Sequence, residues 1–81
     1  MNKEQLVQYV KQGREIEFKY NDKQYSITYG VIDGIEVISF CEFYQETTEV
    51  NDVEELMNVT RDNVTVLQML ESITDEDIWI Y

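Results

Sequence analysis

Two short runs of alternating apolar and polar residues lie next to each other in the first half of the chain. The first is Glu15–Tyr20 and the second is Gln24–Tyr29. Successive side chains of a β-strand point to opposite faces, so this alternation predicts two strands, each with one apolar face. The polar residues between the runs predict that the two strands form an antiparallel hairpin.

The alternation also restricts the length of the hairpin loop. A two-residue loop at Asn21-Asp22 places Phe18 opposite Tyr25. The apolar pair Ile16 and Ile27 then lies on the same face. A three-residue loop would split the apolar sets, because a slip of one residue turns every side chain to the other face. The loop is therefore expected to have two or four residues.

Asp33-Gly34 is a second hairpin signal, and it predicts a third strand over about residues 35–43. With this turn, Tyr29 lies opposite Ile38, so the apolar face continues into the third strand. Apolar side chains also occupy the opposite face of that strand, namely Val37, Cys41 and Phe43. We therefore expect this second face to receive cover or a partner.

A helix is predicted over about residues 3–12, before the hairpin. Asn2 is a good N-cap, Gln5 completes a capping box, and Gly13 is suited to the C-terminal end. The apolar stripe of this helix consists of Leu6, Tyr9 and Val10.

The second half of the chain predicts two short helices. Residues 44–50 fit either an extension of the third strand or a loop. Asn51 is then expected to cap a helix that has Glu54 at its third position. Asp62 or Thr60 is expected to cap a second helix that ends near residue 72. The apolar stripes of the two helices are Val53, Leu56 and Met57, and then Val66, Leu67, Leu70 and Ile73.

The segment Ile78–Tyr81 reads as a short strand that either joins the sheet edge or folds back on the helices. The predicted fold is therefore a single α+β domain over residues 1–81. It has an N-terminal helix, a three-stranded antiparallel meander with a candidate fourth C-terminal strand, and two short C-terminal helices on one sheet face. That face carries Ile16, Phe18, Tyr25, Ile27, Tyr29, Ile38 and Phe40.

Charge is distributed unevenly along the chain. Seventeen Asp and Glu residues against six Lys and Arg residues give a formal net charge of −11. Every base except Arg61 lies in the first 30 residues, so the remainder projects a strong negative field. Such a field repels nucleic acid and anionic membranes and attracts basic proteins.

Several chemistries are disfavoured by composition. The chain has no histidine and a single cysteine, Cys41, so it has no Ser-His-Asp triad, no zinc site and no intrachain disulfide. The first residues are polar, and no apolar run approaches the ~20 residues of a membrane span. We expect a cytoplasmic protein that is not an enzyme and that uses no cofactor and no metal.

Weaker candidate sites have structural explanations that we prefer. Asp75-Glu76-Asp77 reads as a solvated acidic cap, because adjacent carboxylates in an extended segment point to opposite faces. Cys41 has an acidic neighbour that disfavours the thiolate, so we expect it to pack within its strand. The hairpin aromatics fall at core spacing, and the charge opposes their use as a platform for nucleic-acid bases.

The densest group of acids is the strongest functional feature of the sequence. It comprises Glu42, Glu46, Glu49, Asp52, Glu54, Glu55 and Asp62. This group either keeps the protein soluble or forms an interaction face for a basic protein. One form of such a face is a mimic of the nucleic-acid backbone. Trp79 and Tyr81, near the C-terminus, are candidate anchors.

The segment Glu15–Ile27, together with the acidic Glu54-Glu55-Leu56 helix, resembles small proteins of unknown function from Gram-positive bacteria and their phages or mobile elements. The resemblance implies a cytoplasmic bacterial or phage setting and no particular activity. We therefore expect a small acidic module that binds a basic partner. The alternative is a homo-oligomeric structural protein that associates through the second sheet face or the C-terminal edge strand.

Overall fold

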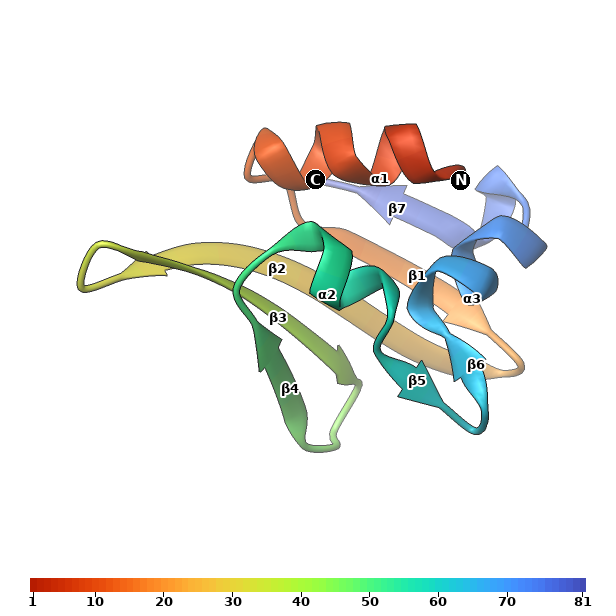
Figure 1. Cartoon of the computed structure of the whole chain (residues 1–81). Coiled ribbons are helices and arrows are strands. Elements are labelled where there is room, and N and C mark those ends of the chain that lie inside the picture. Colours follow the sequence, from red (N-terminus) through yellow and green to blue (C-terminus); the bar gives the residue numbers. More distant parts are fainter.

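The predicted hairpin forms the centre of a five-stranded antiparallel sheet in the computed structural model, which describes residues 1–81 (Figure 1). Strands β1 (Ile16–Tyr20) and β2 (Lys23–Ile32) are joined by Asn21-Asp22, and Phe18 pairs with Tyr25. The two-residue loop is therefore confirmed. Both loop residues have positive φ, at 52° and 63°, which is the backbone of the mirror-image turns that suit a twisted hairpin.

Strand β3 (Ile35–Glu42) continues the meander through the second predicted turn. Asp33 and Gly34 have φ values of 52° and 80°, and Tyr29 pairs with Ile38 as expected. Paired strands β2 and β3 extend beyond their neighbours, so residues 28–37 project from the body as a free hairpin (Figure 1). We call this projecting hairpin the arm.

One further strand joins each side of the meander. Strand β4 (Thr47–Val50) pairs antiparallel with β3, so residues 44–50 contain a turn followed by a separate strand. Strand β7 (Ile78–Ile80) pairs antiparallel with β1, which places the C-terminal segment at the sheet edge and not on the helices. The order across the sheet is β4-β3-β2-β1-β7.

Helix α1 (Lys3–Lys11) starts at the predicted capping box, in which Asn2 Oδ1 accepts a hydrogen bond from the Gln5 amide. Gly13, just past the helix, has a φ of 70° and reverses the chain into β1. This left-handed backbone suits glycine because it has no Cβ to clash with the carbonyl.

Helix α2 (Val53–Met57) begins one residue later than predicted, so Asn51 as its cap is wrong. Asp52 is the N-cap, and its Oδ1 accepts a hydrogen bond from the Glu55 amide at 2.8 Å. Asn51 instead donates from Nδ2 to the Glu36 carbonyl oxygen of β3 at 2.9 Å. A contact distant in sequence therefore decides which of two adjacent capping residues is used.

Helix α3 (Val66–Ser72) is capped by Thr65, so the predicted caps Asp62 and Thr60 are also wrong. Asp62 and its neighbour Asn63 have φ values of 52° and 67° and form a third turn of the hairpin type. This turn joins the short strands β5 (Thr60–Arg61) and β6 (Val64–Thr65). The sequence prediction missed this hairpin because each of its strands has only two residues.

The core lies between one face of the sheet and the three helices. The 3-10 turn η1 (Asp75–Asp77) leads into β7 at the edge of this layer. Thirteen residues are buried, all of them apolar or aromatic, and they are Leu6, Val10, Ile16, Phe18, Tyr25, Ile27, Ile38, Phe40, Leu56, Met57, Val66, Met69 and Leu70. Tyr29 of the predicted face is only half-buried, because it lies where the arm leaves the helices. The opposite face carries no helix, so Ser26 and Cys41 remain partly exposed there.

Aromatic side chains stack at the middle of the core. The ring of Tyr25 lies 5.2 Å from that of Phe18 and 5.4 Å from that of Phe40. Offset stacking stabilises the fold beyond the gain from burying three large rings.

None of the helices is both long enough and apolar enough to cross a membrane.

Replacing a ring of this stack should destabilise the fold far more than replacing a ring on the open face. We expect Phe40→Ala to lower the free energy of unfolding by about 3–5 kcal/mol, the usual cost of a lost core phenylalanine. Phe43→Ala, on the half-exposed face, should cost about 1 kcal/mol. Urea unfolding followed by circular dichroism measures both. Equal losses would contradict the placement of the core.

Candidate functional site

The acidic residues singled out in the sequence lie in three places, namely the β3–β4 hairpin, the start of α2 and the β5–β6 turn. We call them together the acidic segment. Glu42 ends β3, Glu49 lies on β4, and Glu46 lies in the loop between these strands. Asp52 caps α2, whose first turn carries Glu54 and Glu55, and Asp62 lies in the β5–β6 turn. The acidic segment therefore spans several elements, from the β3–β4 edge of the sheet over the start of α2 to the β5–β6 turn.

Few of the carboxylates have a cationic partner within the chain. Glu54 pairs with Lys3 at 3.6 Å, and Asp62 pairs with Lys23 at 3.3 Å. These are the two ion pairs of the structure, so fifteen of the seventeen Asp and Glu side chains have no internal counter-ion. Both pairs are well exposed to solvent, where an ion pair stabilises little.

Arg61, the one base of the C-terminal portion, does not neutralise the acidic segment through an ion pair. Its guanidinium donates to the Thr60 carbonyl oxygen at 2.8 Å and to the Thr48 hydroxyl, and it lies 5.2 Å from the centre of the Phe40 ring. It lines a polar hollow with Glu42 and Glu46. The contacts of Arg61 with Thr48 of β4 and Phe40 of β3 link the β5–β6 hairpin to the sheet.

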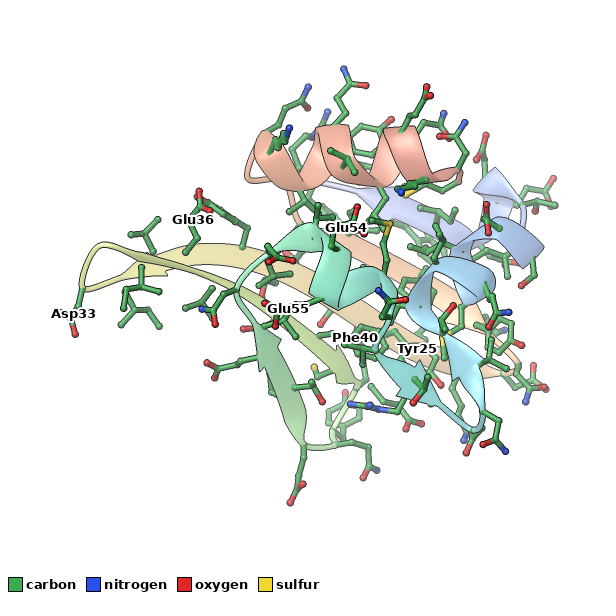
Figure 2. All side chains as sticks on the ribbon, viewed as in Figure 1. Tyr25, Asp33, Glu36, Phe40, Glu54 and Glu55 are labelled. Atoms are coloured by element: carbon green, nitrogen blue, oxygen red, sulfur yellow. The ribbon has the colours of Figure 1, made fainter.

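A groove lies where the arm, the end of α1 and the start of α2 meet. Its volume is about 210 Å³. Its apolar lining includes Val10 and Tyr29, and its carboxylates are Glu36 of the arm and Asp52 of the α2 cap. We call it the arm groove. Figure 2 shows Asp33 at the tip of the arm and Glu36 between that tip and α2.

Sequence reasoning did not single out Glu36 or Tyr29 as site residues. The sequence did contain a signal for the position of Glu36, because the register of the Asp33-Gly34 hairpin places it on the same face as Tyr29 and Ile38. The position of α2 beside this face was not readable from any local pattern. Asn51, just before α2, fixes the position of this helix by donating a hydrogen bond to the Glu36 carbonyl oxygen.

Hydrogen bonding and burial shift the pKa of two tyrosines upward. The Tyr29 hydroxyl donates to Glu36 Oε1 at 3.1 Å, which raises the pKa of Tyr29 above its ordinary value of 10.0. Burial, aided by the negative charge of Glu42, raises the pKa of Tyr25. Both side chains therefore keep their protons to higher pH in the folded chain than in the unfolded chain.

Trp79 and Tyr81 lie at the β7 edge of the sheet, and none of the carboxylates of the acidic segment lines the same groove as they do. Trp79 is on β7 and pairs with Glu17 of β1, while β4 forms the other edge. Their side chains are 42% and 62% exposed, respectively. The structure therefore does not bring the candidate anchors together with the acids of β4, because three strands separate β7 from β4.

The weaker candidates occupy ordinary structural positions. Cys41 is half-buried on the open face, where its Sγ lies 3.4 Å from the Ser26 Oγ. Asp75–Asp77 form the η1 turn. No group of three or more Asp, Glu or Cys side chains is arranged to hold a metal ion.

Comparisons of the chain with protein-family models, with curated proteins and with solved structures give no match.

The raised tyrosine pKa values predict that stability falls at alkaline pH. A group with a raised folded-state pKa contributes its stability fully below the unfolded value, and this contribution is lost as the pH rises through the folded value. We expect the urea midpoint to fall above pH 10, and to fall less in Tyr29→Phe, which has no proton to lose at this position. The fully exposed Tyr44 offers the control Tyr44→Phe, which should behave as the parent does. Identical pH profiles for the parent and Tyr29→Phe would contradict this account.

Proposed function

We propose that this protein is a small acidic interaction module of the bacterial cytoplasm, an accessory protein of a phage or mobile element, that binds a basic protein. The observation that carries the proposal is the large excess of carboxylates without internal counter-ions. A partner that supplies lysines and arginines would give these carboxylates the cations that the chain lacks. Complementary charge of this kind raises the association rate and selects against acidic partners.

The acidic segment is the steering surface of this proposal. Glu49 of this segment lies on the edge strand β4 and Glu54 and Glu55 lie on the first turn of α2, where all three are exposed to solvent. Charges on such rigid elements keep a fixed pattern, which favours one orientation of the partner. Because screening in water acts over about 8 Å at physiological salt, the steering depends on several charges acting together.

The arm groove is the contact surface next to the steering charges. Val10 and Tyr29 offer apolar lining to the alkyl stem of a basic side chain, and Glu36 and Asp52 offer oxygens to its charged end. Lysine and arginine have both parts, since their long stems pack on apolar surface while the charged ends stay near water or acids. Lys11 is the one base in the lining of the groove.

Charge reversal on α2 tests the proposal. The variant Glu54→Lys/Glu55→Lys and the matched control Glu71→Lys/Glu76→Lys both change the formal charge from −11 to −7, but only the first alters the acidic segment. We expect a basic protein captured from a bacterial lysate by the parent and by the control to bind the α2 variant roughly tenfold more weakly. With the purified partner, the association rate should fall steeply with added salt.

Three results would contradict the proposal. One is equal binding by the parent and both variants, and another is an association rate that does not respond to salt. The third is a lysate from which the parent captures no protein at low salt. Thermal unfolding of each variant shows whether a change in binding reflects a loss of fold.

Self-association is a second candidate function, and the exposed apolar side chains of the arm favour it. Ile32 and Ile35 pair across the hairpin on the open face of the sheet and are 59% and 60% exposed. The arm also has free strand edges, which offer backbone groups to a second copy. The charge of −11 on each copy opposes such a contact.

Salt dependence separates the two candidates. Added salt should strengthen self-association, because it screens like charges, whereas it should weaken binding to a basic partner. Sedimentation equilibrium of the parent and of Ile32→Thr/Ile35→Thr measures this. If self-association is the function, the parent is a dimer at high salt and the variant is a monomer. A parent that stays monomeric at every salt concentration would exclude this candidate.

A further inference from the structure

The open face of the sheet contains a second groove, at the end far from the arm. Its volume is about 160 Å³, and it is aromatic and acidic in character. The side chains that give it this character are Glu17, Gln24, Phe43, Trp79 and Tyr81. We call it the aromatic groove. None of the acids in the acidic segment lines it.

Strand pairing fixes the arrangement of the aromatic groove. Trp79 of β7 lies directly opposite Glu17 of β1, a position in which side chains on one face come within about 5 Å at Cβ. Gln24 follows on β2, and its carbonyl oxygen accepts a hydrogen bond from the Phe43 amide at 2.8 Å. Aromatic rings therefore flank a floor that carries one carboxylate and one amide.

The C-terminal side of the groove is held in place before any ligand binds. The Tyr81 amide donates to the Glu15 carbonyl oxygen at 2.9 Å, and Arg14 Nε donates to the Tyr81 carbonyl oxygen at 3.0 Å. These bonds attach Tyr81, which follows β7, to the two residues that precede β1. A site that is already ordered loses less entropy when it binds a ligand.

No cation of the chain fills the groove. Glu17 is half-buried and makes no ion pair, although Lys19 lies two residues further along the same face. The two cation–π contacts of the structure are elsewhere: Arg14 lies over Tyr9, and Arg61 lies over Phe40. A half-buried carboxylate beside free aromatic faces is suited to a cation from outside the chain.

We infer that the aromatic groove binds an arginine side chain of the basic partner, an inference that rests on the proposed function. A guanidinium is planar, so it stacks on the Trp79 indole while its N–H groups donate to the Glu17 carboxylate beside it. A lysine ammonium is a compact charge that lacks this flat face, so it fits the pair less well. The proposed function requires only positive charge, whereas this groove selects which basic side chain binds.

Two peptides of equal length and charge test the inference, a glycine–arginine repeat and a glycine–lysine repeat, each with a fluorescent label. Anisotropy at low salt gives their affinities, and Trp79, the single tryptophan of the chain, reports contact through its emission. We expect the arginine peptide to bind roughly five- to tenfold more tightly and to change the Trp79 emission.

Variants in the aromatic groove should remove the preference for arginine. In Glu17→Gln and Trp79→Leu we expect the two peptides to bind with nearly equal affinity. Glu71→Gln makes the same change of charge outside the groove, and Tyr44→Leu removes a fully exposed aromatic ring outside it, so both should keep the preference. If Trp79→Leu does not fold, Glu17→Gln decides alone, because it keeps the shape of the side chain.

The same measurements separate failure of the inference from failure of the proposed function. Equal affinity for the two peptides, with unchanged Trp79 emission, overturns the inference and leaves the proposed function standing. An arginine preference that persists in Glu17→Gln also overturns it. Glu54→Lys/Glu55→Lys should lower the affinity for both peptides by the same factor, so the ratio of the two affinities should not change. If the affinities do not fall, the acidic segment is not the steering surface, and the inference about the aromatic groove is unaffected. Binding of neither peptide at low salt overturns both proposals.

Discussion

The stack of Phe18, Tyr25 and Phe40 holds the rest of the structure in register. The three rings come from different strands, and their centroids lie 5.2, 5.4 and 6.3 Å from one another, so each ring contacts the other two. A slip of one residue in any of these strands would move its ring to the open face. The stack therefore decides which side of the sheet the helices cover, and the apolar stripes of α1, α2 and α3 pack onto that side.

Covering one face determines what remains available for binding. The helices cover the core side of the sheet, so the carboxylates of α2 and the arm groove lie on this side of the molecule. The opposite face stays open, and β7 carries Trp79 and Tyr81 to its edge next to Glu17. The molecule thus presents two distinct surfaces, one that carries carboxylates without internal counter-ions and one that carries exposed aromatic rings. Three strands lie between β7 and β4, at the two edges of the sheet.

The sequence predicted the central part of the fold well because its signals are local and repeated. Alternation and turn chemistry act within a few residues, so both predicted hairpin registers and the capping box of α1 agree with the structure. Helix starts in the second half were less well predicted. Asn51 and Asp52 are equally good caps, and a hydrogen bond from Asn51 to β3 decides between them. The β5–β6 hairpin was missed because two-residue strands leave no periodic pattern.

The sequence by itself determined the register of the meander and the excess of negative charge, since both follow from residue types and their order. The tertiary structure alone decided where the charges and the aromatic side chains meet. Glu36 and Asp52 are neighbours only because α2 packs beside the arm, and Glu17 and Trp79 are neighbours only because β7 pairs with β1. The pairing of β7 with β1 joins residues about 60 positions apart. Contacts over such separations depend on the packing of the whole core, which leaves no mark in the local pattern.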